Sequence, residues 1–287
     1  MWFVYIFISA LFSSAATVFV KLGVKDVDTT LATLIKTVVV VLIAWTVVFA
    51  GGTTPQIAQI SRRTMTFLVL SGLTTGGSWI CDYSALKLGD VDTAIAVSRC
   101  SMVLSVVLAF LFLGDPFTVW SLVGTLLILG GSLLMIDPKH RNSRQPLSRP
   151  WLLWVTGGIL FSSTTTILGK VGISGVNSNL GTAIHSLVVL IMTCAMVGTS
   201  GKWKQIKGIP RQKMVCLLLS GAASAITWLT YYRGLQLQYA SIVAPTDKLL
   251  SGVLTALMAY FVFQEQVDRR AALALGCIGA GTVIIVL

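Results

Sequence analysis

Residues 12–37 read FSSAATVFVKLGVKDVDTTLATLIKT, and residues 161–186 read FSSTTTILGKVGISGVNSNLGTAIHS. The two stretches align without a gap at an offset of 149 residues (161 minus 12), and the same offset carries Trp79 onto Trp228. Further matches at this offset pair Lys21 with Lys170, Gly23 with Gly172, Lys36 with His185, and residues 70–72 with 219–221. The chain is therefore one unit written twice, and this repeat governs how the rest of the sequence is interpreted.

The composition is that of a membrane protein. Hydrophobic residues make up 55% of the chain, charged residues 11%, and the mean hydropathy is +0.86, whereas a soluble globular protein has roughly 25% charged residues. The net charge of +11 does not indicate nucleic-acid binding, because Lys and Arg lie mostly in loops between apolar runs, where they set membrane topology. Composition therefore predicts a multi-pass protein of the lipid bilayer with no nucleic-acid partner.

Several functional classes have no support in the sequence. No nucleophile–base pair and no phosphate-binding loop is evident, and no basic segment of a signal peptide precedes the first apolar run. The five cysteines lie in apolar segments without metal-ligand spacing and are interpreted as small core residues: Cys81, Cys100, Cys194, Cys216 and Cys277. We therefore expect no enzymatic activity, no metal and no cofactor.

Ten apolar runs are each about as long as the roughly 20 residues that cross a bilayer as a helix. The first repeat, 1–136, holds expected spans at residues 2–22, 29–50, 64–87, 93–113 and 118–136. The second repeat, 151–287, holds expected spans at residues 151–173, 179–197, 213–236, 240–263 and 271–287. A polar linker, residues 137–150, rich in Pro, Ser and Arg, separates the two repeats.

Five spans per repeat is an odd number, so the second copy must enter the membrane upside down. We therefore expect an all-α fold of two inverted five-helix repeats. This arrangement is typical of secondary transporters, in which the substrate site lies near the midplane between the halves.

Ionisable side chains inside the expected spans are costly and normally face a cavity or a partner. Those of the first repeat lie towards one membrane face, and by the inversion those of the second lie towards the other. The sequence thus predicts two polar half-sites, one for each gate. The residues are Lys21, Lys36, Asp82 and Arg99 in the first repeat, and Lys170, His185, Arg233, Asp247 and Lys248 in the second.

Some of these residues have simpler interpretations. Lys21, Lys170 and Arg233 lie near span ends, where the side chain can instead extend to the interface. His185 is either a neutral, hydrogen-bonded core residue or a proton-linked site. Asp247 and Lys248 are adjacent, about 100° apart around a helix. One of them is therefore expected to meet another span, with Arg233 or Lys170 as the candidate partner.

Aromatic residues accompany these charges on two spans. Trp79 and Tyr83 share one helix face, as do Trp228 and Tyr232, because each pair is four residues apart. Together with Tyr231 they form either an interfacial aromatic belt or the wall of a substrate cavity.

Glycines also recur in the expected spans. Gly72 and Gly76 allow the backbones of two helices to approach closely. The alternatives are ordinary packing within one bundle and a dimer face.

Several motifs resemble a known family. Residues 83–89 (YSALKLG) and 232–235 (YRGL) resemble the end of its third helix, and residues 112–115 (FLGD) and 263–265 (FQE) the end of its fourth. Residues 244–249 (APTDKL) resemble its short, single-copy members. On these motifs, and over nearly its whole length, the chain resembles two EamA domains of the drug/metabolite transporter superfamily.

The resemblance implies a small-molecule carrier, often an exporter, usually with cytoplasmic termini. We also expect a bacterial-type inner membrane and a monomer or homodimer. Lys36 and His185 occupy the place where many members carry Arg. Met102 and Gly252 stand where larger members have a helix-four Pro, which leaves the helix shape open there. Residues 98–99 (Ser-Arg) correspond to Asp247-Lys248, so the halves have diverged, as one asymmetric substrate would favour.

The balance of charge within the spans predicts the type of substrate. The expected spans hold six Lys or Arg side chains and two carboxylates, Asp82 and Asp247, which leaves a surplus of four positive charges (six minus two). A mobile anion would neutralise this surplus. We therefore expect a secondary transporter, working by alternating access as an exporter or exchanger, for a metabolite with an anionic group. The alternatives are an exporter of cationic or amphipathic drugs, amines or amino acids and, in another class, a lipid-headgroup flippase.

Loop charge predicts the orientation of the chain. If the termini are outside, Arg62 and Arg63 are the only basic residues in the outer loops. The other Lys and Arg residues found in loops then lie in the inner loops. The positive-inside rule therefore predicts extracytoplasmic termini, opposite to the orientation that the family resemblance implies.

Thiol labelling tests this orientation. Cysteines introduced singly at Ser143 and Trp203, both in expected inner loops, should resist an impermeant thiol reagent added to intact cells. Labelling of either one from outside would reverse the orientation.

Overall fold

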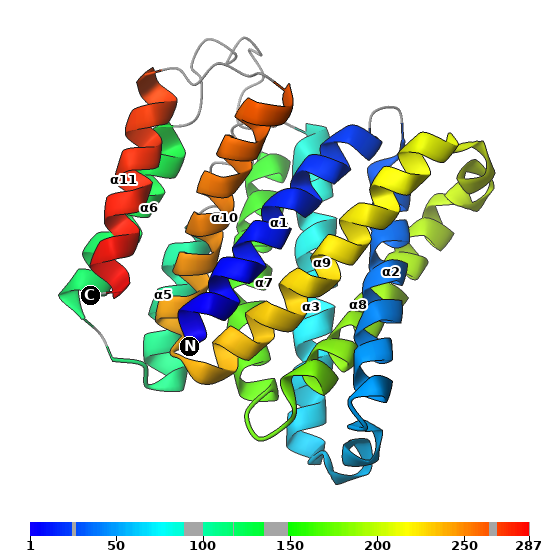
Figure 1. Ribbon diagram of the computed structural model, residues 1–287, viewed down its shortest axis with the longest axis horizontal. Coiled ribbons are helices and arrows are strands. Elements are labelled where there is room, and N and C mark those ends of the chain that lie inside the picture. Colours follow the sequence, from blue (N-terminus) through cyan, green and yellow to red (C-terminus); the bar gives the residue numbers. More distant parts are fainter. Residues whose placement is uncertain (25–26, 89–99, 117, 135–148, 264–268, 287) are drawn as a thin grey trace.

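A computed structural model of the protein describes residues 1–24, 27–88, 100–116, 118–134, 149–263 and 269–286. These residues form a bundle of α-helices with two short 3-10 helices, and none of them forms a strand (Figure 1). The helices of the first repeat are α1 (Trp2–Val24), α2 (Thr29–Ala50), η1 (Thr54–Gln59), α3 (Arg62–Leu88), α5 (Cys100–Leu113) and α6 (Val119–Leu134). Those of the second are α7 (Arg149–Gly172), α8 (Ser178–Ser200), η3 (Lys202–Gly208), α9 (Arg211–Leu237), α10 (Ala240–Phe263) and α11 (Arg269–Val286).

Six of the described helices are long and apolar enough to cross a membrane: α1, α2, α7, α8, α9 and α10. Shorter apolar helices are formed by α5 and by most of α6. The protein is thus a helical membrane protein, as the composition predicts.

The second helix of each repeat begins at an equivalent residue. Asp28 Oδ1 accepts a hydrogen bond from the backbone N–H of Thr30 at 3.0 Å, and Asn177 Oδ1 accepts one from the N–H of Asn179 at 2.9 Å. Each side chain thereby caps a helix start whose first N–H groups have no intrahelical partner. Asp28 and Asn177 are related by the offset of 149 residues (177 minus 28), so the helix-start signal is repeated with the sequence.

The two repeats are interlocked rather than placed side by side. Helix α1 packs along α9, and its repeat counterpart α7 packs along α3 in the same way. Helix α2 packs on its counterpart α8, and α6 packs on its counterpart α11. The most extensive helix contacts therefore join one repeat to the other.

Glycine permits two of these contacts. A Cβ atom on Gly72 would lie 2.6 Å from Cβ of Val188, and one on Gly221 would lie 2.6 Å from Cβ of Val39. The two pairs are related by the repeat offset, and they join α3 to α8 and α9 to α2. Gly76 faces α8 as well. These glycines therefore serve packing within the bundle, the first of the two alternatives.

The two ends of the bundle carry different groups. Lys202 Nζ in η3 lies 2.5 Å from Asp28 Oδ2 before α2, so η3 and the α1–α2 connection share one side, which we call the basic face. Burial raises the pKa of Asp28, but the hydrogen bond and charge of Lys202 outweigh this and hold that pKa below its ordinary value. Both chain ends lie towards the opposite side, the lower side of Figure 1, which we call the terminal face.

Substitution of Gly72 tests the close approach of α3 and α8. We expect Gly72→Ala to lower the thermal unfolding midpoint of the purified protein in detergent, because overpacking costs about 1–3 kcal/mol. Gly276→Ala in α11 is the matched control, since a Cβ there meets nothing within 4 Å, and it should leave the midpoint unchanged or slightly raised. Equal midpoints for the two variants would contradict the packing described here.

Candidate functional site

A cavity of about 390 Å³ lies inside the bundle, walled by α1, α2, α3, α7, α9 and α10. We call it the central cavity. Both copies of the repeat contribute the same positions to its wall. The equivalent pairs, each at the offset of 149 residues, are Ser13 and Ser162, Ala16 and Thr165, Thr17 and Thr166, Val20 and Gly169, Thr75 and Ser224, Ser78 and Thr227, and Trp79 and Trp228.

Two ammonium groups face the central cavity. The half-buried Lys36 comes from α2 and the exposed Lys248 from α10, and they are close enough for their charges to repel. Lys248 also interacts electrostatically with Asp82 and with its neighbour Asp247. Within the described part of the chain, neither Lys36 nor Lys248 forms an ion pair with a carboxylate. The described lining of the cavity thus holds two ammonium groups and one carboxylate, that of Asp247.

Asp247 meets another span, but its partner is not the one expected. Its side chain is 5% exposed, and Oδ1 accepts a hydrogen bond from Ser9 Oγ of α1 at 2.6 Å. Arg233 is exposed and donates to Gln236 Oε1 at 2.7 Å, and Lys170 donates to backbone carbonyls of α9. The prediction that Arg233 or Lys170 would pair with Asp247 is therefore wrong.

His185 lies behind the cavity wall and is 2% exposed. Its Nδ1 is 3.1 Å from Ser71 Oγ and its Nε2 is 3.4 Å from Thr75 Oγ1. Its ring lies 5.1 Å from the ring of Trp228 and 5.5 Å from that of Tyr232, measured between centroids. This environment favours the hydrogen-bonded core histidine over an open proton site, and it places the His185 ring against Trp228.

The aromatic residues form part of the cavity wall. Trp79, Trp228, Tyr231 and Tyr232 all line the central cavity. Trp228 contacts both tyrosines, with ring centroids 6.2 Å from Tyr231 and 5.8 Å from Tyr232. Of the two alternatives, a cavity wall and an interfacial belt, the geometry of these four side chains favours the wall.

The remaining predicted residues lie elsewhere. Lys21 is exposed near the end of α1. Asp82 is half-buried on α3 and packs against α7, where a Cβ on Gly158 would lie 2.7 Å from its Oδ1. Arg99 and the side chain of Tyr83 lie outside the described part of the structure.

Sequence reasoning singled out charges and aromatic rings and missed the hydroxyl groups of the wall. Thr165 Oγ1 donates to Thr74 Oγ1 at 2.8 Å, and Thr166 bonds the Tyr231 hydroxyl. The signal for them was present, because the repeated stretches keep Ser and Thr at 13–17 and 162–166.

Comparison with known proteins identifies the class. The EamA-like transporter family matches residues 1–137 and 149–287, so the chain belongs to the EamA-like transporter family. This confirms the resemblance to the drug/metabolite transporter superfamily. The protein is an integral, multi-pass membrane transporter, which implies a small-molecule substrate and a lipid bilayer as its surroundings.

Two relatives add detail. An uncharacterized transporter in the cobO 3' region of a Sinorhizobium species is 37% identical over 134 residues, which make up 47% of this chain and 95% of that protein. This bacterial relative is therefore about half as long, and it is consistent with a bacterial inner membrane. A crystal structure of another protein superposes with a TM-score of 0.77 at 16% identity, covering 98% of this chain and 97% of the other. This structural similarity shows that the two chains share a fold.

Removal of the Ser9 hydroxyl tests the contact between α1 and α10. We expect Ser9→Ala to lower the thermal unfolding midpoint, because a buried acceptor left without its donor costs about 1–3 kcal/mol. The loss should be smaller in an Asp247→Asn background, where the acceptor is neutral. Ser105→Ala is the control, since that hydroxyl bonds a carbonyl of its own helix. Equal shifts for the two serine variants would contradict a special role for Ser9.

Proposed function

We propose that the protein is a secondary transporter that moves a small metabolite by alternating access between two inverted five-helix repeats. The repeats are residues 1–136 and 151–287, joined by the linker 137–150, and they supply ten transmembrane helices. The observation that carries this proposal is the central cavity, to which both repeats contribute equivalent positions. A site shared by two halves is what a rocking motion of one half against the other requires.

The directions of α1 and α7 support the inversion. The end of α1 lies at the basic face, because Asp28, just beyond it, pairs with Lys202. The end of α7 lies near the terminal face, because Gly172 packs against Leu68 near the start of α3, where a Cβ on Gly172 would lie 2.9 Å from Leu68 Cδ2. Equivalent helices of the two repeats thus run in opposite directions (Figure 1).

The charge of the cavity supports a substrate with an anionic group. Among the described residues, two ammonium groups, of Lys36 and Lys248, line the cavity against the single carboxylate of Asp247, and a surplus of charge inside a membrane is costly. A carboxylate or phosphate of the substrate would neutralise these ammonium groups. Trp79 and Trp228 would contact its apolar or ring portion, and a volume of about 390 Å³ fits a small metabolite.

The direction of transport follows the family resemblance, and we propose an exporter or exchanger. The first alternative is an exporter of cationic or amphipathic drugs, amines or amino acids, held by Asp247 or Asp82 and the aromatic faces. Asp247 is engaged by Ser9 and adjoins Lys248, which makes it the weaker site for a cation. A lipid-headgroup flippase is excluded if the purified protein transports a soluble solute.

Neutralisation of the cavity lysines tests the substrate class. A thermal-shift screen against pooled metabolites first identifies a ligand, since a ligand stabilises the state that binds it. We expect Lys36→Gln and Lys248→Gln each to abolish uptake of that anionic ligand into proteoliposomes, and Arg99→Gln to do the same. Lys204→Gln on the basic face is the control and should transport normally. Unchanged anion uptake in the cavity variants, with increased efflux of organic cations, would refute the anionic substrate.

A further inference from the structure

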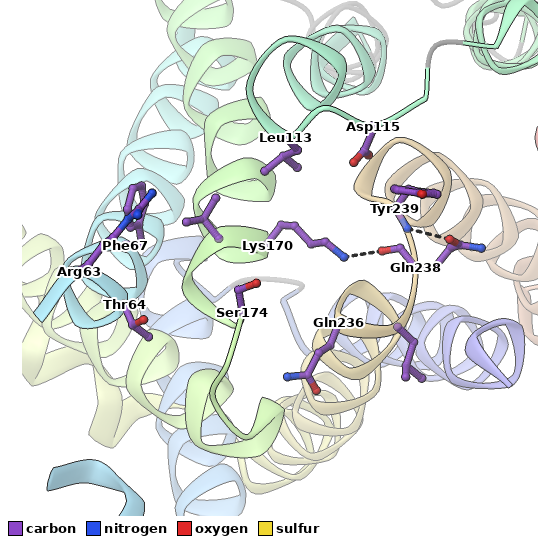
Figure 2. Close-up of a pocket in the computed structure, with 12 residues that line it drawn as sticks. Arg63, Thr64, Phe67, Leu113, Asp115, Lys170, Ser174, Gln236, Gln238 and Tyr239 are labelled. Atoms are coloured by element: carbon purple, nitrogen blue, oxygen red, sulfur yellow. Dashed lines mark hydrogen bonds between the residues drawn. The ribbon is translucent and has the colours of Figure 1, made fainter. Parts of the chain in front are cut away.

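A second and larger cavity, of about 710 Å³, opens at the terminal face (Figure 2). It lies among the start of α3, the ends of α5, α7 and α9, and the start of α10. Its wall mixes polar and apolar side chains, and the polar ones include Arg63, Lys170, Asp115, Gln236 and Gln238. We call it the terminal cavity.

Consecutive residues of two helices line the central cavity and the terminal cavity. On α7, Gly169 lines the central cavity and the next residue, Lys170, lines the terminal cavity. On α9, Leu235 lines the central cavity and the next residue, Gln236, lines the terminal cavity. The two cavities therefore lie back to back across the same two helices.

Reciprocal hydrogen bonds join the ends of α7 and α9. Lys170 Nζ of α7 donates to the carbonyl oxygens of Leu235 and, at 2.6 Å, of Gln238 at the end of α9. Gln236 Nε2 of α9 donates to the carbonyl oxygens of Ile173 at 3.0 Å and Val176 at 2.8 Å, just beyond α7. Each helix thus caps the carbonyl end of the other.

Two further residues set the geometry of these bonds. Arg233 donates to Gln236 Oε1, which turns the Gln236 amide N–H groups towards the carbonyls of the α7 end. Asp115 accepts from the N–H of Ser241 at 2.9 Å, and its charge interacts with that of Lys170. Figure 2 shows Lys170 reaching across the terminal cavity towards Gln238, with Asp115 on the far side.

We propose that the terminal cavity is the vestibule of the transport path. The hydrogen bonds of Lys170 and Gln236 then hold closed the gate between this vestibule and the central cavity, and we call these two side chains the latch. The proposal rests on the transport function proposed above, since it assigns the gate between the substrate site and one membrane face. Breaking the four hydrogen bonds frees the ends of α7 and α9 to part. The released carbonyl groups lie at helix ends beside the vestibule, where water can replace their partners.

The repeat extends the inference to the opposite face. Lys21 and Lys87 occupy the positions of Lys170 and Gln236 at the offset of 149 residues. Lysine, like glutamine, is a side-chain donor to carbonyl groups. The first repeat therefore has side-chain donors at the two equivalent positions of the sequence.

Thiol labelling tests the latch without reference to any substrate. A single Ser162→Cys reporter in the central cavity is placed in a variant that lacks the five native cysteines. Right-side-out and inside-out membrane vesicles then expose either face to an impermeant maleimide, and a protease-sensitive N-terminal tag identifies the terminal face. We expect Lys170→Met and Gln236→Leu each to increase labelling from the terminal face several-fold, because each loses half of the latch.

Ser174→Ala is the control for these variants, because Ser174 lines the terminal cavity but takes no part in the latch (Figure 2). It should label at the unmodified rate. Unchanged labelling in both latch variants overturns the proposal, and so does an equal increase from both faces, which indicates general loosening. An unaltered or lower rate from the basic face supports it. Because labelling needs no substrate, a wrong substrate class leaves this result intact.

Discussion

The close approach of α3 to α8, and of α9 to α2, is the contact on which the site depends. A Cβ at Gly72 would lie 3.1 Å from the carbonyl oxygen of His185, and one at Gly221 would lie 2.9 Å from that of Lys36. Each glycine thus leaves room for one turn of a helix in the other repeat. Gly72 makes room for the turn of α8 that carries His185, and Gly221 for the turn of α2 that carries Lys36. Any side chain at either glycine would push this turn outward, and His185 or Lys36 would move with it. The same two contacts join the repeats, so assembly and site geometry have one physical origin.

The two repeats build a common cavity but use it differently. Lys36 faces the cavity, whereas its counterpart His185 is buried among Ser71, Thr75 and aromatic rings. An ammonium group cannot replace His185 in that setting without losing most of its hydration, which inside a membrane is costly. The difference between Lys36 and His185 therefore makes the two half-sites unequal, as binding of one asymmetric substrate requires.

The sequence anticipated the helices well and the contacts less well. The expected spans at 29–50 and 240–263 coincide with α2 and α10, because their apolar runs have clear polar ends. The aromatic and lysine residues of the cavity were recognisable, since charge inside a membrane is rare. The partner of Asp247 was not, because Ser9 is one of many hydroxyls and lies 238 positions away. The role of Lys170 was hidden as well, because its partners are backbone carbonyls, which every residue possesses.

Lys170 is hydrogen-bonded to backbone carbonyls and not to a carboxylate, and this difference affects how the proposed gate can open. A buried ion pair that is parted leaves two unpaired charges, and breaking such pairs is strongly destabilising. Lys170, if released from the carbonyls of Leu235 and Gln238, would remain in a cavity that Asp115 also lines. The carbonyls at the helix ends exchange one donor for water. In the proposed gate, opening would therefore leave no pair of separated buried charges, and a substrate would shift the two states only by its differential affinity for them.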